Sequence, residues 1–388
     1  MWDTRSAMLT AQLLHPSEVS AADADAWRAL AAATPAFANP LLGPDFAQAV
    51  GQVRRDARVA IWRRGDTPAG FLPLHYRPGA YARPIGAPLS DYHALVSGPD
   101  LGARGPELLG LAGLGAFAHT GLVDPHLLFG PPAETQASYV VDLDLPSEAY
   151  LESLRAESPK KFKNWRRLDH KLEREVGPVR LVAPDTSQTT FETLFAWKRE
   201  QLRRTGGHDF LAPDWTCRLF SGLFARREGD FQGLMIGLYA GDRLVAGHFG
   251  VRLGGVYHPW IAAADPALAA MSPGQVFLVR AIGGMSRMGL TSYDLGPGHD
   301  HYKCAFARSQ MQIGAGLVTA PNSAGRAAEG VDRAWALAGA RRDGFAARLR
   351  RRLEVIAAAE TTLIGRTRGL ADAVAGQARR RLQPGDAS

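Results

Sequence analysis

A hairpin pattern that occurs twice constrains the fold of this chain most strongly. Residues 58–74 contain two extended apolar runs around Gly65-Asp66, and residues 234–253 contain two more around Gly241-Asp242. Apolar runs that flank a Gly-Asp turn predict a β-hairpin. The two turns lie roughly 176 residues apart. That spacing favours two copies of one α/β unit, and a chance similarity is the alternative.

Length and composition bound the class of protein. With 388 residues the chain exceeds one typical core, so we expect at least two domains. Its two cysteines, Cys217 and Cys304, are too few for a disulfide framework and too scattered for a zinc site. Residues 1–10 lack the apolar core of a signal peptide, and the longest apolar stretch, 108–118, is shorter than the roughly 20 residues that span a bilayer. We therefore expect a cytoplasmic protein.

A basic amphipathic segment lies between the two hairpins. Residues 147–176 carry apolar side chains at three- and four-residue steps, which predicts a helix. The opposite face carries Lys160, Lys161, Lys163, Arg166, Arg167, Lys171 and Arg174. Such a face can steer an anionic substrate, and an ordinary solvated helix face is the alternative. We assign residues 147–178 as a basic linking helix and expect further helices at 189–205 and 213–224.

The C-terminal residues differ in composition from the rest of the chain. Between positions 341 and 381 there are eleven arginines and four acidic residues, and an apolar stripe runs from Phe345 to Ile356. We expect residues 321–388 to form an Arg-rich helical appendage outside the catalytic fold. Arginine forks suit phosphates, so the candidate anion-binding residues are Arg341, Arg342, Arg350, Arg351 and Arg352. A cyclic dinucleotide, an anionic membrane surface and plain solvent are the three alternatives for this tail, and we expect no DNA partner.

Several short motifs follow one another in a fixed order. Ser272-Pro273-Gly274-Gln275 predicts a helix start, whose free amides and dipole favour an anion, and Gly274 allows close backbone approach. An ordinary helix cap is the alternative reading. The other motifs are Arg83-Pro84-Ile85-Gly86-Ala87-Pro88-Leu89-Ser90-Asp91-Tyr92, Gly247-His248-Phe249-Gly250, Tyr293-Asp294-Leu295-Gly296-Pro297-Gly298 and Tyr302-Lys303-Cys304-Ala305-Phe306.

In this order the motifs resemble the GNAT acyltransferases of bacterial polysaccharide loci, the CelD-like or BioF2-like proteins, which are relatives of the Fem peptidyltransferases. The resemblance covers roughly residues 40–320. It implies an α/β (α+β) chain of two tandem GNAT-like domains with mixed twisted sheets. The implied domains are residues 1–146 and residues 179–320, and the second binds the acyl donor.

The resemblance also implies roles for the donor side. Such folds hold the donor beside a splayed strand, here Ala246–Leu253, and place its pyrophosphate on a helix start, here Ser272, Gly274 and Gln275. The donor is acetyl-CoA or another acyl-CoA. Lys303 stands at the lysine of the family's Tyr-Lys-x-x-Phe motif, which is thought to stabilise negative charge on the transferred carbonyl. Tyr302 is a candidate proton donor to the leaving thiolate, with edge packing as the alternative.

The acceptor side has weaker candidates. No glutamate stands where some GNAT enzymes keep a general base, so His248 is the candidate base, with a buried structural histidine as the alternative. Asp91 and Tyr92 are candidate acceptor contacts, or an Asx-type turn with a buried ring. Asp294 is a candidate for the acceptor pocket. Residues 299–301, His-Asp-His, invite a metal interpretation, which we reject because GNAT chemistry needs no metal and further ligands are not apparent.

Three functions remain open at this stage. The first is N-acylation of an amino sugar, free or lipid-linked, during exopolysaccharide or holdfast-type polysaccharide biosynthesis. The second is a Fem-like transfer from aminoacyl-tRNA, which the basic segment allows. The third is a non-catalytic effector that binds an anionic signal through the Arg-rich tail.

Overall fold

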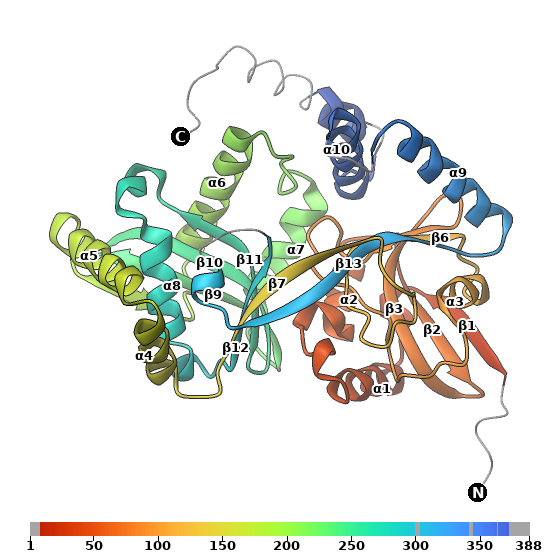
Figure 1. Ribbon diagram of the computed structural model, residues 1–388, viewed down its shortest axis with the longest axis horizontal. Coiled ribbons are helices and arrows are strands. Elements are labelled where there is room, and N and C mark those ends of the chain that lie inside the picture. Colours follow the sequence, from red (N-terminus) through yellow and green to blue (C-terminus); the bar gives the residue numbers. More distant parts are fainter. Residues whose placement is uncertain (1–7, 299–302, 341–343, 363, 372–388) are drawn as a thin grey trace, which may run out of the picture. The chain divides into compact units, whose positions relative to one another are not determined.

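The computed structural model describes residues 8–298, 303–340, 344–362 and 364–371, in a mixed α/β fold (Figure 1). The chain divides into two compact units. Unit 1 comprises Met1–Thr135, Leu202–Leu219 and Ile313–Ser388, and unit 2 comprises Gln136–Gln201 and Phe220–Gln312. Within the described ranges no helix has the length and apolar character needed to cross a membrane.

Unit 1 is built mainly from the N-terminal third of the chain and receives its last elements from the C-terminal region. Its strands are β1 (Leu9–Leu14), β2 (Ala57–Arg64), β3 (Thr67–Arg77), β4 (Tyr81–Pro84), β5 (Val96–Ser97), β6 (Ala116–Leu122) and most of β13 (Ser309–Thr319). Its helices are α1 (Ala21–Ala32), α2 (Pro44–Gly51), α3 (Gly105–Leu111), α9 (Ser323–Leu337) and α10 (Phe345–Ala359).

Unit 2 holds the middle of the chain. Its strands are β7 (Glu134–Asp142), β8 (Val179–Val182), β9 (Phe231–Ala240), β10 (Arg243–Leu253), β11 (Val256–Ala264) and β12 (Ser292–Pro297). Its helices are α4 (Ser147–Glu157), α5 (Pro159–Glu175), α6 (Gln188–Thr205), α7 (Asp214–Ala225) and α8 (Pro273–Gly283). The end of α6 and the start of α7 belong to unit 1.

The same strand order occurs in both units. In unit 1 it is β1-β2-β3-β4-β6-β13, and in unit 2 it is β8-β9-β10-β11-β12-β7. All neighbours are antiparallel except one pair in each unit, β4 with β6 and β11 with β12. The last strand of each unit comes from an unexpected place in the chain. β7 follows β6 in sequence but pairs with β12, and β13 follows β12 but pairs with β6. The predicted repeat of one α/β unit is therefore confirmed.

The two predicted hairpins are the β2–β3 and β9–β10 pairs. Their turns have the same backbone form, because Gly65 has φ of 59° and Gly241 has φ of 58°. Glycine adopts this left-handed conformation without the steric penalty of a Cβ atom. The Gly-Asp dipeptide therefore specifies the turn in each copy, and the strand pairs Arg64 with Thr67 and Ala240 with Arg243 close it.

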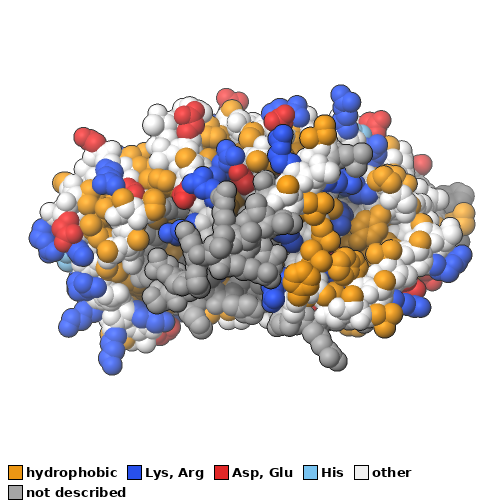
Figure 2. All heavy atoms as spheres, turned by 90° about the horizontal axis from the view of Figure 1, so that it is seen from above, with side chains coloured by type: hydrophobic (Ala, Val, Ile, Leu, Met, Phe, Trp, Pro, Cys, Tyr) orange, Lys and Arg blue, Asp and Glu red, His pale blue; other side chains and the backbone are white. Residues whose placement is uncertain are grey.

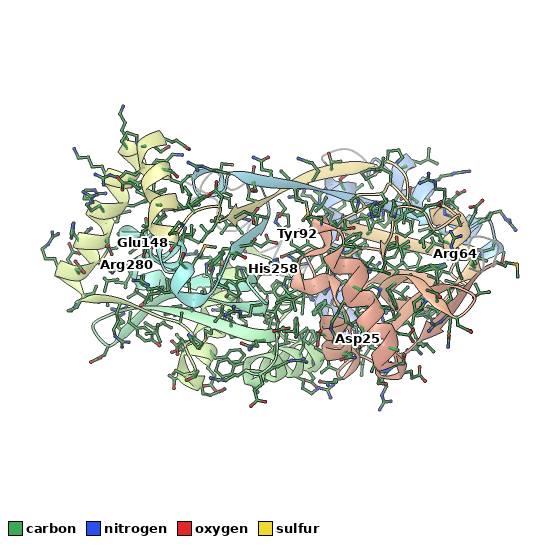
Figure 3. All side chains as sticks on the ribbon, turned by 90° about the horizontal axis from the view of Figure 1, so that it is seen from below. Asp25, Arg64, Tyr92, Glu148, His258 and Arg280 are labelled. Carbon is green, nitrogen blue, oxygen red and sulfur yellow. The ribbon has the colours of Figure 1, made fainter. Side chains whose placement is uncertain are left out.

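The basic segment is part of unit 2 and does not form a separate linker. It is two helices, α4 and α5, because Pro159 disfavours a helical conformation at the preceding residue, and Ser158 has φ of −135°. The apolar side of α5, including Trp165 and Leu172, belongs to the buried core of unit 2. Arg280 of α8, which is labelled in Figure 3, holds α5 through a two-pronged contact with Asp169 (2.8 and 3.2 Å).

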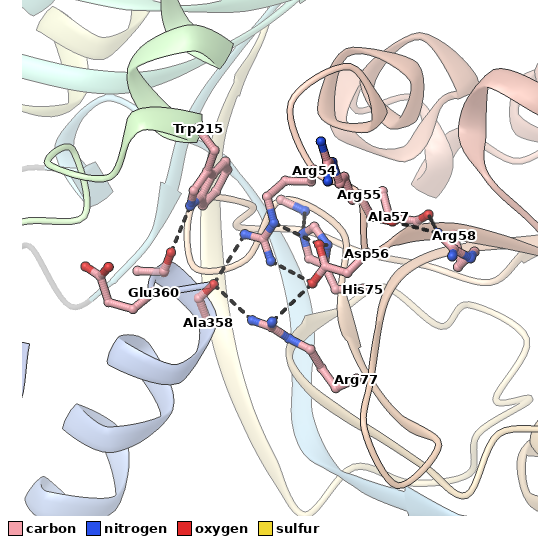
Figure 4. A network of polar contacts seen from close by, with 12 residues as sticks. Arg54, Arg55, Asp56, Ala57, Arg58, His75, Arg77, Trp215, Ala358 and Glu360 are labelled. Carbon is pink, nitrogen blue, oxygen red and sulfur yellow. Dashed lines mark hydrogen bonds and ion pairs between the residues drawn. The ribbon is translucent and has the colours of Figure 1, made fainter. Parts of the chain in front are cut away.

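The Arg-rich C-terminal region includes α10, and the last carbonyl groups of this helix bind side chains of unit 1. Arg77 donates to the carbonyl of Ala357 at 2.8 Å, and Trp215 donates from Nε1 to the carbonyl of Ala359 at 2.8 Å (Figure 4). Positive groups at a helix C-terminus are favoured by its unpaired carbonyls and dipole. The expected helical C-terminal region is present as α9 and α10, and both helices belong to unit 1.

Candidate active site

The parallel pair in unit 2 opens soon after it begins. β11 and β12 pair only at Val256 with Ser292 and at Tyr257 with Tyr293. Beyond these residues β11 remains paired with β10, and β12 remains paired with β7. In the part of the chain that the structure describes, no backbone segment bridges the gap that follows. The carboxyl ends of β11 and β12 therefore diverge, and this opening is the candidate donor site.

This geometry corrects the expected position of the splayed strand. Ala246–Leu253 belongs to β10, which is paired antiparallel on both sides, with β9 and with β11. A strand whose two edges are both occupied cannot accept a ligand edge-on. The pair that diverges is one strand further on, where a parallel neighbour replaces an antiparallel one.

Helix α8 begins after the carboxyl end of β11. Pro273 is its first residue, as predicted, and has no N–H, while the amide of Gln275 donates to the Ser272 carbonyl. The amide of Gly274 is therefore the first-turn donor that remains for an anion. A Cβ atom on Gly274 would meet no atom within 4 Å, so the space beside this turn is open.

Ser272 does not cap α8 in the expected way. Its backbone is left-handed, with φ of 47° and ψ of 54°, and its side chain accepts no capping hydrogen bond. The left-handed backbone turns the side chain away from the first-turn amides that an extended cap residue would reach. The hydroxyl of Ser272 is therefore available to a ligand beside Gly274.

A buried ammonium group lies after the end of β12. Lys303 begins the short helix η6 (Lys303–Ala305), and its side chain is 7% exposed. Its Nζ atom donates to the carbonyl oxygen of Pro297 at 2.8 Å. Tyr302 lies outside the described residues, so its proposed proton transfer stays a prediction. The same holds for His299, Asp300 and His301.

His248 lies on β10 and faces α8. Its Nδ1 atom is 2.7 Å from the hydroxyl of Tyr293, and its ring packs on Phe277. Burial, together with the nearby ammonium groups of Lys198 and Lys303, lowers the pKa of His248 to about 3. A neutral imidazole with so low a pKa is a weak base. The base role of His248 stays a prediction, and the geometry also gives it a role in fixing Tyr293.

One tryptophan connects the two landmark motifs. The Nε1 atom of Trp165, on α5, donates to Oε1 of Gln275 at 3.1 Å. The Trp165 ring stacks on Phe306 with ring centroids 4.4 Å apart. The carbonyl of Phe306 in turn accepts from the hydroxyl of Tyr150 at 2.6 Å. The start of α8 and the segment after Lys303 are therefore held by the same side chain.

In unit 1 the corresponding edge is filled by the chain itself. β4 and β6 pair only at Tyr81 with Ala116 and at Ala82 with Phe117. Beyond them His93 occupies the edge of β6, where its Nε2 accepts from the amides of Thr120 (3.1 Å) and Gly121 (2.9 Å). The carbonyl of His93 accepts from the Val123 amide at 2.8 Å. No comparable opening exists among the described residues of unit 1.

The same segment contains the expected acceptor contacts Asp91 and Tyr92. The side chain of Tyr92 is completely buried. A Cβ atom on Gly121 would clash with the carbonyl of Asp91, so these two backbones pack directly together. The burial of this ring agrees with the alternative of a buried ring, and the acceptor contact of Tyr92 stays a prediction. The side chain of Asp91 is half-buried.

Two of the expected anion-binding arginines have other partners. Arg350 pairs with Asp332 (2.7 Å) and Glu354 (2.9 Å), and Arg352 donates to the carbonyl of Gly206 (2.8 Å). Arg350 therefore links α9 to α10. Two carboxylates pair with its charge in this structure, where the sequence had suggested an anionic ligand. Arg351 is exposed, and Arg341 and Arg342 lie outside the described residues.

Sequence reasoning missed Trp165 and His258, and it did not foresee the partner of Asp294. Trp165 has the three- and four-residue spacing of an ordinary core residue, and nothing in that pattern indicates its contact with Gln275. His258 and Asp294 are buried and approach to 3.2 Å between Nδ1 and Oδ2, but they come from different strands. Asp294 is 2% exposed, and its expected place in an acceptor pocket stays a prediction. His258 and Asp294 each directly follow the last residue at which β11 and β12 pair with each other. This position indicates their contact only when the register of the two strands is known.

Together these features define a class of enzyme. A parallel strand pair that opens at its carboxyl end, a helix start that offers an amide to an anion and a buried lysine are the features expected of the donor side of a GNAT-type acyltransferase. Residues 159–304 match the family described as acetyltransferase (GNAT) domain. That range extends from the start of α5 to one residue beyond Lys303. The chain therefore carries a GNAT acetyltransferase domain and is an acyltransferase.

Comparison with solved structures gives similar folds at low identity. FemX is 12% identical, with 79% of this chain and 96% of that chain covered and a TM-score of 0.49. The C-terminal DUF2156 domain of a putative lysylphosphatidylglycerol synthetase from Agrobacterium fabrum is 12% identical, with coverage of 81% and 96% and a TM-score of 0.46. A tandem GNAT protein from the clavulanic acid biosynthesis pathway is 12% identical, with coverage of 81% and 100% and a TM-score of 0.42. No curated protein matches this chain.

Proposed function

We propose that this enzyme transfers an acyl group from acetyl-CoA, or another acyl-CoA, to the amine of an amino sugar during polysaccharide biosynthesis. The observation that carries the donor assignment is the opening between β11 and β12 with the Gly274 amide at its carboxyl end. The acceptor class rests on the resemblance of the ordered motifs to enzymes of bacterial polysaccharide loci.

The proposed reaction is a thioester aminolysis. The amine nitrogen attacks the thioester carbonyl carbon, a C–N bond forms, the C–S bond breaks, and the amine proton ends on the CoA thiolate. The buried ammonium of Lys303 would stabilise the negative charge that develops on the carbonyl oxygen, since such a group is worth more in a closed site than in water. Tyr302 is the proposed donor of the proton to the thiolate.

Calorimetry with acetyl-CoA tests the donor. We expect one molecule per chain, because unit 1 fills the corresponding edge with His93. A thiol-release assay with glucosamine-type acceptors, free or nucleotide-linked, tests the acceptor. Failure of acetyl-CoA to bind would overturn the donor assignment. Binding and slow hydrolysis without transfer to any amino sugar would overturn the acceptor class alone.

The exposed face of α5 favours a second candidate, transfer from an aminoacyl-tRNA. Lys160, Lys161, Lys163 and Arg166 are exposed, and no acidic side chain pairs with any of them in the described part of the chain. Unpaired cations along one helix suit a phosphate backbone. Filter binding of charged tRNA at low and moderate salt tests this, with a Lys160→Glu, Lys163→Glu variant as comparison. Equal, weak binding by both proteins would remove this candidate.

The surface of α9 and α10 supports the proposal that the protein contacts an anionic membrane or a nucleotide. Val331, Leu337 and Phe345 are exposed large hydrophobic residues, and Figure 2 shows hydrophobic side chains gathered beside Lys and Arg on the side that carries these helices. Apolar side chains next to cations suit an anionic lipid surface. Sedimentation with phosphatidylglycerol vesicles tests this, with Leu337→Asp as comparison. Calorimetry with a cyclic dinucleotide and an Arg351→Glu variant tests the nucleotide alternative.

A further inference from the structure

We propose that His258 and Asp294 form a buried positioning pair that holds Lys303 in place. The inference rests on the proposed role of Lys303 in acyl transfer. Pairing between β11 and β12 ends at Tyr257 and Tyr293, so His258 and Asp294 are the first residues of the two diverging strands. Their side chains are 0% and 3% exposed, and Nδ1 lies 3.2 Å from Oδ2. The pair therefore joins the strands at the point where they separate.

The second carboxylate oxygen of Asp294 holds the turn that follows. Oδ1 accepts from the amide of Gly296 at 2.7 Å. Gly296 has φ of 76° and Gly298 has φ of 138°, so this backbone has conformations that favour glycine and needs an external partner to define its path. A buried carboxylate that accepts an amide hydrogen bond supplies that partner.

The turn in turn holds Lys303. The Pro297 carbonyl, one residue after Gly296, accepts from the Nζ atom of Lys303 at 2.8 Å. A continuous set of contacts therefore leads from His258 through Asp294 and the turn to the Lys303 ammonium. An ammonium on a four-carbon stem has many rotamers, and restraining it at a carbonyl of fixed position reduces that freedom.

This arrangement accounts for a carboxylate that is buried at the site. Desolvating a carboxylate is costly unless polar groups compensate it; Oδ1 of Asp294 accepts from the Gly296 amide, and Oδ2 lies 3.2 Å from Nδ1 of His258. Displacement of a catalytic group by about 1 Å can lower a rate about 100-fold. His258 and Asp294 are thus positioning residues, which act on the reaction through Lys303.

A double-mutant cycle tests the proposal. We expect Asp294→Ala to lower kcat about 10- to 100-fold while the Kd for acetyl-CoA, set at α8, stays within about twofold. In a Lys303→Arg background, which keeps the charge but not its place, Asp294→Ala should lower kcat by less than about twofold. His258→Asn should act in the same direction. Asp142→Asn removes an exposed carboxylate opposite Ser292 on β7 and should leave kcat unchanged.

A second measurement keeps the test independent of activity. Acylation of Lys303 by acetic anhydride, followed by mass spectrometry, should be several-fold faster in Asp294→Ala than in the unaltered protein. If Asp294→Ala does not fold, Asp294→Asn keeps an acceptor for the Gly296 amide and should give a smaller effect of the same kind. Equal losses of kcat in both Lys303 backgrounds, with unchanged labelling, would overturn the positioning role alone. Full activity of Lys303→Ala would overturn it together with the proposed role of Lys303.

Discussion

Trp165 donates from its indole nitrogen to the side-chain oxygen of Gln275 across 3.1 Å, and this bond joins α5 to the first turn of α8. We expect Trp165→Phe to keep the stacking on Phe306 but to lose the hydrogen bond, which lowers the free energy of unfolding by about 1 kcal/mol. The Kd for acetyl-CoA should rise about fivefold, since the turn that binds the pyrophosphate is less well held. Urea unfolding and calorimetry measure the two effects.

The matched control is Trp335→Phe on α9, which leaves unit 2 unaltered. It should leave the Kd for acetyl-CoA unchanged. A Trp165→Phe protein with unaltered donor affinity would mean that α5 does not support the donor turn.

Gly274 separates donor binding from stability. A Cβ atom at this position meets no protein atom, so Gly274→Ala should not destabilise the protein and should raise the free energy of unfolding by up to about 1 kcal/mol. The same methyl group occupies the space that a pyrophosphate would approach, and the Kd for acetyl-CoA should rise more than about tenfold. Gly330→Ala on α9 also meets no atom and serves as the control, with unaltered affinity. Unaltered affinity in Gly274→Ala would place the donor elsewhere.

Acid should destabilise the protein through its buried histidines. Burial lowers the pKa of His248 to about 3 and that of His75 to about 4, below the ordinary value of 6.5. Between pH 6.5 and about 4 the unfolded chain therefore binds protons that the folded chain does not, so stability falls as the pH is lowered through this window. Each such group contributes about 1.4 kcal/mol per pH unit at most.

Urea unfolding at pH 7.5, 6.5, 5.5 and 4.5 measures this dependence. The slope of the unfolding free energy against pH should be smaller in His248→Asn, by up to about one proton. An identical slope in the variant and the unaltered protein would mean that the pKa of His248 is the same in the folded and unfolded states.

Docking of α10 should contribute to the stability of unit 1. Ile356 is buried on α10, so Ile356→Ala should lower the free energy of unfolding by about 2–5 kcal/mol. Phe345 on the same helix is 62% exposed, and Phe345→Ala should change it by less than about 0.5 kcal/mol. Differential scanning calorimetry of both variants measures this. Equal, small effects would mean that the packing of α10 does not stabilise unit 1.

The candidate donor site was partly predictable. Pro273 at the first position of α8 and Gly274 beside it follow from local rules for helix starts. The ordered motifs indicated Lys303, which is buried at the end of β12. The strand that diverges is β11, one strand after the expected Ala246–Leu253. Whether the edge of a strand is paired depends on the neighbouring strands, and the apolar alternation within the strand does not show it. His258 was missed for the same reason.

The sequence by itself determined the repeated hairpins and the helix starts, because turn chemistry and periodicity act over a few neighbouring residues. Tertiary structure alone decided the rest. The exchange of β7 and β13, the docking of α10 on Trp215 and the approach of His258 to Asp294 all join residues far apart in the chain. Such contacts depend on strand register and helix packing, which leave no local pattern in the residues that make them.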